Sequence, residues 1–256
     1  MRYEKIKVLI TVKTYPLPSR TYQELVCTAG VREDGSFIRL YPIDYRYRPY
    51  WQWYKKYQWI EVEVTKNQKD PRKESYRPKV ETIRPLGKPL PTKNKWQERK
   101  NYVLAQGYKT IEELKELQKI DHTSLGIIKP KIISDFSFEE TEKDWEPAQK
   151  IALRQQRLFG PENKPLEKIP FKFFYHFTCT GPRCNGHKMQ IIDWELGQLY
   201  RRMRHDYKFS PEKSAEKVKE KFFNQICSPN RDTYFFVGTV LPFHSWIVLG
   251  VFWPPK

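Results

Sequence analysis

The first ninety residues alternate hydrophobic and polar positions with a period of two, which is the pattern of half-buried β-strands. The alternation predicts five short strands, at residues 6–12, 24–31, 37–41, 59–64 and 79–83. Between the second and third of these, Asp34 and Gly35 favour a tight hairpin, because both residues tolerate positive φ. Five short strands with little intervening helix predict a small, closed or half-closed β-barrel of the OB, PUA or SH3 type.

The middle of the chain is rich in proline, lysine and helical patterns. Pro85, Pro89 and Pro91 predict an extended connector over residues 85–100. Thr110 and Glu113 have the spacing of a capping box, so we expect a helix to begin just after Thr110. The sequence then predicts, in order, a strand at 125–133, an acidic stretch at 139–146, a helix at 147–159 and a second connector at 161–170.

The last third of the chain predicts two strands, two helices and two strands. The strands are expected at residues 171–179, 188–192, 233–240 and 246–253. Asp193 is placed to cap the first helix, which runs to about residue 205, and Ser210 is placed to cap the second. We therefore expect an α+β protein with a β-barrel-like lobe at 1–90, a helical and extended connector region at 91–165 and a Cys/His-containing ββααββ lobe at 166–256.

The net charge of the chain indicates the kind of partner that the protein binds. The sequence holds 47 Lys and Arg against 30 Asp and Glu, a formal net charge of +17. A surplus of this size attracts polyanions, so the expected partner is nucleic acid, either DNA or RNA. The alternative is a protein that its lysines merely keep soluble. The 8 Trp, 16 Tyr and 15 Phe residues supply enough ring surface for a core, which argues against disorder.

Hydropathy bears on the cellular compartment. The longest apolar stretch, residues 246–253, is shorter than the roughly 18 residues that a membrane span needs. The opening residues do not follow the pattern of a signal peptide, so we expect a cytoplasmic protein with no membrane partner. In that compartment the 4 cysteines are expected to be reduced thiols or metal ligands rather than disulfides.

A short run near residue 180 brings together three residues that bind metals. Cys179, Cys184 and His187 follow the spacing C-x4-C-x2-H on a turn that contains glycine and proline. Thiolate and imidazole ligands favour zinc, which takes four ligands in structural sites. The candidates for the fourth ligand are Cys227, His205 and His176, and Cys227, just beyond a predicted helix, is our first choice. The alternatives are that the cysteines are small buried hydrophobic side chains or that one of them is catalytic.

Two carboxylates follow the same turn. Asp193 and Glu195 lie close to His187 in the sequence, and these three residues could bind Mg²⁺ and activate water for phosphodiester hydrolysis. The other interpretation is structural. Asp193 caps a helix, and Glu195 lies in its first turn, where the helix dipole favours a carboxylate.

Residues 41–59 include nine aromatic side chains, and cations are interleaved with them. This mixture is typical of surfaces that stack bases and neutralise phosphates. On a short helix, Tyr50, Trp53, Tyr54 and Tyr57 would share one side, and we expect them in the core. The residues expected on the surface, in contact with nucleic acid, are Arg46, Tyr47, Arg48, Trp51, Lys55 and Lys56. The alternative is that half of the rings fill the barrel or dock it onto the other lobe.

Two smaller basic groups are further candidates for phosphate contact. They are Arg72, Lys73 and Arg77 on a polar loop, and Arg201, Arg202 and Arg204 on the helix that follows Asp193. Asp70 and Glu74 could instead neutralise the loop. Positive charge near the end of a helix is stabilising without any ligand.

Motifs that are missing narrow the function. The sequence lacks the patterns G-x-x-x-x-G-K-[ST], G-x-G-x-x-G, G-x-S-x-G and H-E-x-x-H. P-loop ATPases, Rossmann oxidoreductases, α/β-hydrolases and zincins are therefore disfavoured. The sequence predicts a nucleic-acid-binding protein with a basic and aromatic surface, suited to structured, single-stranded or modified nucleic acid. A metal-dependent nuclease and a structural adaptor for a protein partner are the alternatives.

Overall fold

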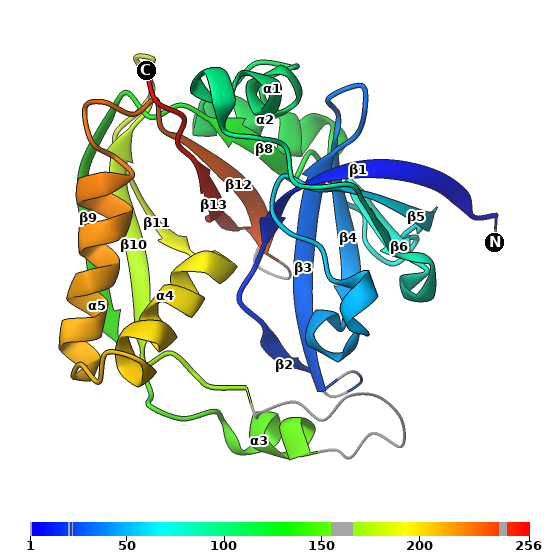
Figure 1. Cartoon of the computed structure of the whole chain (residues 1–256). Coiled ribbons are helices and arrows are strands. Elements are labelled where there is room, and N and C mark those ends of the chain that lie inside the picture. Colours follow the sequence, from blue (N-terminus) through cyan, green and yellow to red (C-terminus); the bar gives the residue numbers. More distant parts are fainter. Residues whose placement is uncertain (1, 20, 22, 155–165, 241–244) are drawn as a thin grey trace. The chain divides into compact units, whose positions relative to one another are not determined.

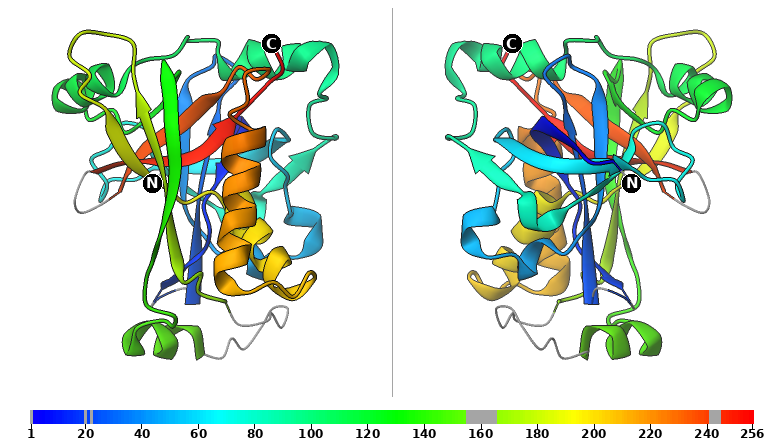
Figure 2. Two further views of the ribbon diagram at one scale, coloured as in Figure 1. Left: turned by 90° about the vertical axis from the view of Figure 1, so that its left-hand side faces the viewer. Right: turned by 90° about the vertical axis from the view of Figure 1, so that its right-hand side faces the viewer.

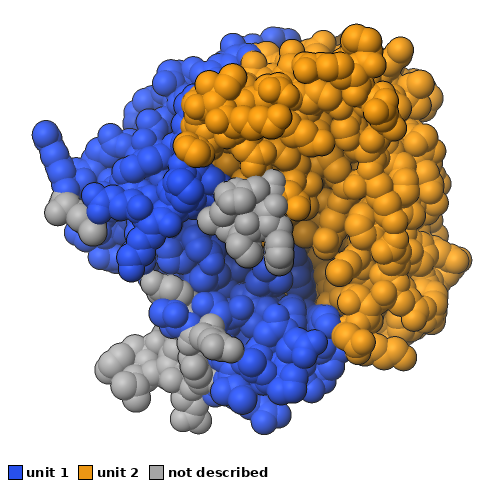
Figure 3. All heavy atoms as spheres, turned by 180° about the vertical axis from the view of Figure 1, so that it is seen from behind, with its two compact units in different colours: residues 1–93, 97–106, 144–168 blue, residues 94–96, 107–143, 169–256 orange. Residues whose placement is uncertain are grey.

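The computed structural model describes residues 2–19, 21, 23–154, 166–240 and 245–256 and divides the chain into two compact units (Figure 3). Unit 1 spans residues 1–93, 97–106 and 144–168, and unit 2 spans residues 94–96, 107–143 and 169–256. The segment expected to be a connector region, 91–165, is shared between the two units. Its helices and strands contribute to both, because their apolar faces need a core to pack against.

Unit 1 is built on a small β-barrel (Figure 1). Its strands are β1 (Glu4–Lys13), β2 (Leu17–Ser19), β3 (Gln23–Val31), β4 (Phe37–Ile43), β5 (Trp59–Lys66), β6 (Ser75–Pro78) and β7 (Arg84–Leu86). In the described chain, five of them follow the order β1-β3-β4-β6-β5, and β1 pairs with β5 to close the barrel. The β4–β6 pairing is parallel, and the other pairings are antiparallel. The predicted barrel is confirmed.

In unit 1 the predicted hairpin is present, whereas the strand predicted at 79–83 is not. β3 and β4 form an antiparallel pair around the Asp-Gly turn, where Asp34 Oδ1 accepts a hydrogen bond from the Ser36 amide (2.9 Å). The strand expected at 79–83 is wrong, because a 3₁₀ turn, η3 (Val80–Thr82), occupies its centre. The Thr82 hydroxyl donates to the Lys79 carbonyl (2.7 Å), and this local bond closes the turn.

The remaining elements of unit 1 are short. They are the 3₁₀ turns η1 (Tyr45–Tyr47) and η2 (Tyr50–Gln52), the helix α3 (Pro147–Arg154) and most of α1 (Lys93–Val103). The predicted helix over 147–159 coincides with α3 as far as residue 154, and its last part lies outside the described residues. The first part of the connector expected at 161–170 lies outside them as well.

Unit 2 contains a mixed sheet of six strands in its described residues. Its elements are α2 (Ile111–Asp121), β8 (Leu125–Ile128), β9 (Ile132–Glu140), β10 (Phe171–Thr178), β11 (His187–Ile191), α4 (Trp194–His205), α5 (Pro211–Lys219), the π-helical turn η4 (Glu220–Gln225), β12 (Tyr234–Val240) and β13 (Ser245–Phe252). The strand order is β8-β12-β13-β11-β10-β9. From β10 onward, the elements have the predicted ββααββ order.

The helices of unit 2 begin where the sequence predicts. Thr110 Oγ1 accepts from the Glu113 amide (3.2 Å), and Glu113 Oε2 accepts from the Thr110 amide (2.6 Å), which together form the expected capping box. The Asp193 carboxylate caps α4, and the Ser210 hydroxyl caps α5, with Pro211 in the first turn.

The core of unit 2 lies between its sheet and its helices. Figure 2 shows α4 and α5 beside one another along the sheet. Strand β10 turns alternate rings inward, so Phe173, Tyr175 and Phe177 are buried. The Tyr175 ring stacks on Phe235 at 4.4 Å between centroids, and its hydroxyl donates to the Phe222 carbonyl (2.8 Å). Among the helices that the structure describes, none has the length and apolar character needed to cross a membrane.

Candidate metal centre and nucleic-acid interface

Four side chains of unit 2 form a group that could hold a metal ion. Glu112, Cys179, Cys184 and His187 each offer one ligand atom, and these atoms all lie within 4.8 Å of one another. Three of the ligands come from the β10–β11 hairpin, and Glu112 comes from the first turn of α2. The predicted motif thus brings its two cysteines and its histidine together.

The local sequence explains how the hairpin forms this group. Cys179 continues the inward alternation of β10 and is buried among the core side chains. Gly181 (φ 136°) and Gly186 (φ 90°) adopt backbone conformations that residues with a Cβ rarely reach, so the chain can turn tightly around Cys184. His187 begins β11, where it pairs with Phe177.

The distances within the group suit tetrahedral coordination. The Cys184 Sγ to His187 Nε2 distance is 3.3 Å, and the His187 Nε2 to Glu112 Oε1 distance is 3.0 Å. In a tetrahedral zinc site, with metal–ligand bonds of about 2.0–2.3 Å, neighbouring ligand atoms lie roughly 3.3–3.8 Å apart. These two distances are therefore close to those of a zinc site, and all the ligand atoms lie within 4.8 Å of one another.

The protonation states of Cys179 and His187 bear on whether the group can hold a metal ion. Burial raises the pKa of the Cys179 thiol to about 11, although a hydrogen bond from the Ile111 amide favours the thiolate. Burial also lowers the pKa of His187, so the neutral imidazole that ligates metals is the favoured form. A metal ion would supply the positive charge that the Cys179 thiolate needs, since metal binding displaces the thiol proton.

The fourth residue of the group differs from the one that the sequence suggested. Cys227 is absent from the group; it follows the end of η4, and its thiol donates to the Phe222 carbonyl (3.3 Å). Burial raises the pKa of this thiol to about 12, as expected of a thiol that packs against the core. Glu112 takes the place that we assigned to Cys227. Sequence reasoning missed Glu112 because a carboxylate in the first turn of a helix is already explained by the helix dipole.

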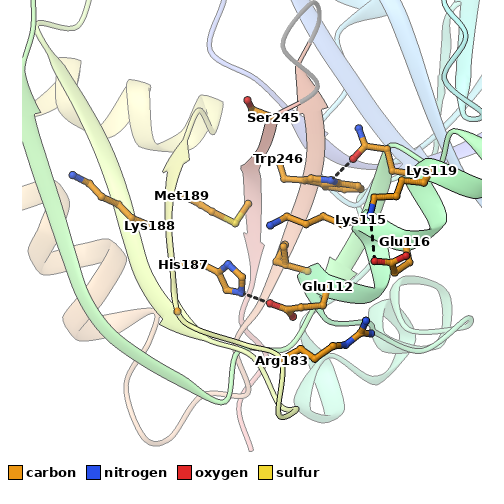
Figure 4. A pocket seen from close by; sticks show the side chains of 13 residues that line it. Glu112, Lys115, Glu116, Lys119, Arg183, His187, Lys188, Met189, Ser245 and Trp246 are labelled. Carbon is orange, nitrogen blue, oxygen red and sulfur yellow. Dashed lines mark hydrogen bonds and ion pairs between the residues drawn. The ribbon is translucent and has the colours of Figure 1, made fainter.

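A pocket of about 670 Å³ adjoins the metal group (Figure 4). Glu112 and His187 form part of its wall. The other charged or aromatic residues that line it are Lys115, Glu116, Lys119, Arg183, Lys188 and Trp246. In Figure 4, Lys115 extends across the pocket toward His187, whereas Lys188 points away from its centre. The lining therefore places positive charge beside the candidate metal ligands.

In the structure, Asp193 caps a helix and Glu195 lies at the surface. The buried Asp193 carboxylate accepts a hydrogen bond from the Glu195 amide (2.6 Å) and caps α4. The Glu195 side chain is exposed and lines a second, smaller pocket. Among the described residues, neither carboxylate joins His187 in a metal-ligand group. A hydrolytic role for Asp193 and Glu195 stays a prediction.

Unit 1 carries a group of exposed rings between residues 41 and 53. Tyr50 is 82% exposed and Trp51 is 65% exposed, and Tyr41 and Trp53 are also exposed. We expected Tyr50 and Trp53 in the core with Tyr54, and for these two rings the expectation is wrong. Pro49 precedes a separate 3₁₀ turn, so the segment forms η1 and η2 instead of one helix, and the four rings do not share a face.

The exposed rings are anchored to the barrel by a ladder of aromatic contacts. Successive ring centroids lie 4.9 Å apart for Tyr54 and Tyr45, 5.4 Å for Tyr45 and Trp53, and 4.9 Å for Trp53 and Tyr50. Tyr54 is 1% exposed, so the ladder runs from the core to the surface. The Trp53 indole donates to the Arg48 carbonyl (2.7 Å), which fixes its ring. The outermost rings are therefore held on a rigid support.

The cations beside this ladder are of two kinds. Arg46 pairs with the buried Glu24 (2.9 Å), and Arg48 pairs with Asp44 (2.7 Å), so both arginines form ion pairs within unit 1. Lys55 is exposed. The other two residues predicted at this surface, Tyr47 and Lys56, are half-buried.

The side chains of the two smaller basic groups differ in their exposure and in their contacts. Arg72 forms an ion pair with Asp70 (2.7 Å), whereas Lys73 and Arg77 are exposed. On α4, Arg202 faces Asp206 (3.7 Å), and Arg204 donates to the Phe209 carbonyl. Arg201, also on α4, lies 3.5 Å from the Gln198 side-chain oxygen.

Comparison with family models gives two consecutive matches. Residues 4–105 match a domain of unknown function, DUF8758, and residues 107–256 match another domain of unknown function, DUF8757. A search of curated proteins found no match. All four residues of the metal group lie within the second of these domains. Because that match covers more than half of the chain, the protein belongs to the DUF8757 family.

Proposed function

We propose that the protein binds nucleic acid by stacking bases on the exposed rings of unit 1, and that a zinc ion stabilises unit 2. The observation that carries the first part is the exposure of Tyr41, Tyr50, Trp51 and Trp53 within one short segment of the barrel. A cluster of exposed rings on a folded protein marks an interaction surface, and base stacking on such rings contributes about 1–3 kcal/mol per base.

Charge favours nucleic acid over a protein partner for this surface. The chain carries a net charge of +17, and exposed cations such as Lys55, Lys73 and Arg77 belong to the same unit as the rings. Phosphates attracted by this charge would bring bases to the ladder, with single-stranded or unpaired segments preferred because their bases are free to stack. An adaptor that buries the same rings against a protein is the alternative that the test below separates.

The donor set supports zinc as the metal of unit 2. Two thiolates and one imidazole are ligands that zinc prefers, and a carboxylate completes a set of four. Hard cations such as Mg²⁺ and Ca²⁺ are bound by oxygen ligands, so the two cysteines argue against them. The ion would tie the first turn of α2 to the β10–β11 hairpin.

Binding of labelled single-stranded RNA and DNA, followed by fluorescence anisotropy, tests the nucleic-acid function. We expect the Trp51→Ala variant to lose about tenfold in affinity, because one stacking contact is removed. Tyr108→Ala is the matched control, since Tyr108 is an exposed ring of unit 2 that is not among the residues predicted to contact nucleic acid. Equal affinities of wild type and Trp51→Ala would contradict the proposal. So would an affinity that does not fall between low and physiological salt.

Elemental analysis of the purified protein tests the zinc assignment. We expect one zinc ion per chain in the wild type and its loss in Cys184→Ser. Cys27→Ser is the control, because Cys27 lies in β3 and outside the metal group. Cys227→Ser should also retain zinc, since its thiol bonds to a backbone carbonyl. Zinc that is missing from the wild type, or that persists in Cys184→Ser, would reject the assignment.

A further inference from the structure

The four candidate ligands have unequal access to the pocket beside them. Glu112 and His187 line the pocket, whereas the two cysteine side chains are outside its lining. The Cys179 thiol is buried in the core of unit 2. The two cysteine sulfurs would therefore bind a metal ion on the side away from the pocket. The Glu112 and His187 ligands would lie on the side that faces the pocket.

Glu112 is the ligand that can leave most easily. The other three ligands lie on one hairpin and would keep a metal ion chelated without help from α2. The Glu112 side chain keeps 18% of its surface exposed. A carboxylate oxygen is also a weaker ligand for zinc than a thiolate, and other oxygen ligands can replace it.

The positively charged side chains that line the pocket favour an anionic oxygen ligand in place of Glu112. Lys119 pairs with Glu116 (3.5 Å), and Lys188 pairs with Glu139, which leaves Lys115 and Arg183. Both of these side chains are exposed, and neither forms an ion pair with another described residue. Lys115 follows Glu112 by three positions on α2, so both side chains lie on the same face of the helix. An anion that approached the metal would therefore meet a lysine.

We propose that this pocket binds a phosphate group, with one phosphate oxygen replacing Glu112 on the zinc ion and Lys115 pairing with a second oxygen. The bond from zinc to the carboxylate breaks and a bond from zinc to the phosphate oxygen forms, with no change in oxidation state. The pocket of about 670 Å³ has room for a nucleoside attached to the phosphate. The favoured ligand is thus a phosphate monoester, such as the end of a nucleic-acid strand. This inference rests on the zinc site proposed above.

Cobalt substitution gives a direct readout of the exchange. The visible d–d bands of Co²⁺ respond to the number and type of its ligands, and a separate charge-transfer band reports bound thiolate. We expect inorganic phosphate and a nucleoside 5′-monophosphate to change the d–d bands and to leave the thiolate band in place. An oligonucleotide with a 5′-phosphate should act as they do, and the same oligonucleotide with a 5′-hydroxyl should not. A response to the 5′-hydroxyl form would overturn the preference for a monoester.

Two variants test the roles of Glu112 and Lys115. Glu112→Gln should retain the metal through three ligands and bind phosphate more tightly, because the competing carboxylate is gone. Lys115→Met should weaken phosphate binding by about tenfold, the loss expected for one charge-assisted hydrogen bond. Lys119→Met is the matched control, because Lys119 already has a carboxylate partner on the same helix.

The outcomes separate this inference from the proposed function. Unchanged d–d bands at saturating phosphate, loss of metal from Glu112→Gln, or equal phosphate affinities of Lys115→Met and Lys119→Met would each overturn it. Trp51→Ala should respond to inorganic phosphate as the wild type does, so failure of base stacking leaves the pocket inference standing. A wild-type protein that binds neither zinc nor Co²⁺ would end both the zinc assignment and this inference.

Discussion

The carboxylate of Glu112 lies 3.0 Å from His187 Nε2, although the two residues come from a helix and a hairpin that are far apart in the sequence. This contact joins α2 to β11 at the metal group. A metal ion bound there would add to the stability of unit 2, because it binds the folded ligand set and has far less affinity for the unfolded chain.

Chelation should therefore lower the melting temperature of unit 2. With zinc at about 100 times its Kd, binding contributes about 2.7 kcal/mol. Its removal should lower Tm by roughly 5–10 °C for a unit of this size. Differential scanning calorimetry with and without a chelator measures the shift, and Cys184→Ser should melt at the chelated value. If the chelator leaves the thermogram of the wild type unchanged, the metal group has no stabilising role.

Asp70 makes the stability of unit 1 sensitive to acid. Burial alone would raise the pKa of its carboxyl, but hydrogen bonds from Arg72 and Ser75 outweigh burial and lower the pKa to about 2. The folded-state pKa is below the unfolded one, so the carboxylate stabilises the fold above about pH 4. This contribution is lost as the pH falls toward 2.

Urea unfolding at pH 7 and at pH 2 tests this assignment. We expect Asp70→Asn to cost about 1–2 kcal/mol at pH 7 and to cost much less at pH 2, where the wild-type carboxyl is also becoming neutral. A penalty that is the same at both values of pH would show that Asp70 acts through packing and not through its charge.

The role of Asp193 can be decided by comparing two substitutions. Asp193→Ala removes the oxygen that accepts the Glu195 amide, so unit 2 should lose about 1 kcal/mol of stability. Asp193→Asn should lose much less, since asparagine is also a good N-cap. Thermal unfolding measures both. If a metal-dependent nuclease activity were detected and Asp193→Asn abolished it without loss of stability, the predicted catalytic role would be favoured over capping.

Much of the fold could be predicted because the relevant signals are local. The inward rings of β10 follow a period of two, and the capping box of Thr110 and Glu113 needs only four residues. The barrel was recognisable from its run of short strands. These features depend on steric and hydrogen-bonding preferences of neighbouring residues, which the sequence displays directly.

The metal group could be predicted only in part, because one of its four ligands is brought in by tertiary structure. Cys179, Cys184 and His187 are close in sequence, and their ligand chemistry identifies them. Glu112 joins them through tertiary structure, since α2 packs onto the core beside the β10–β11 hairpin. Tyr50 was misplaced on different grounds: helical periodicity assumes one helix, and the chain forms two 3₁₀ turns on either side of Pro49.

Arg46 forms an ion pair with the buried Glu24, so its removal should affect the stability of unit 1 more than nucleic-acid binding. Glu24 is 1% exposed, and its Oε2 lies 2.9 Å from an Arg46 nitrogen, so removing the arginine leaves a buried carboxylate without this partner. Loss of one partner from a buried pair costs about 3–5 kcal/mol, because the remaining charge stays desolvated. We therefore expect Arg46→Ala to destabilise the barrel strongly in urea unfolding.

Arg46 is also one of the residues that we predicted to contact nucleic acid, and the ion pair gives that prediction a test. The Arg46 guanidinium is already paired with Glu24. At a temperature where both proteins are folded, the affinity of Arg46→Ala for oligonucleotides should therefore be within about twofold of that of the wild type. Lys55→Ala removes an exposed cation next to the ladder and should weaken binding and reduce its salt dependence by about one phosphate contact. The reverse result, a large loss of affinity for Arg46→Ala and none for Lys55→Ala, would mean that the arginine leaves Glu24 to pair with a phosphate.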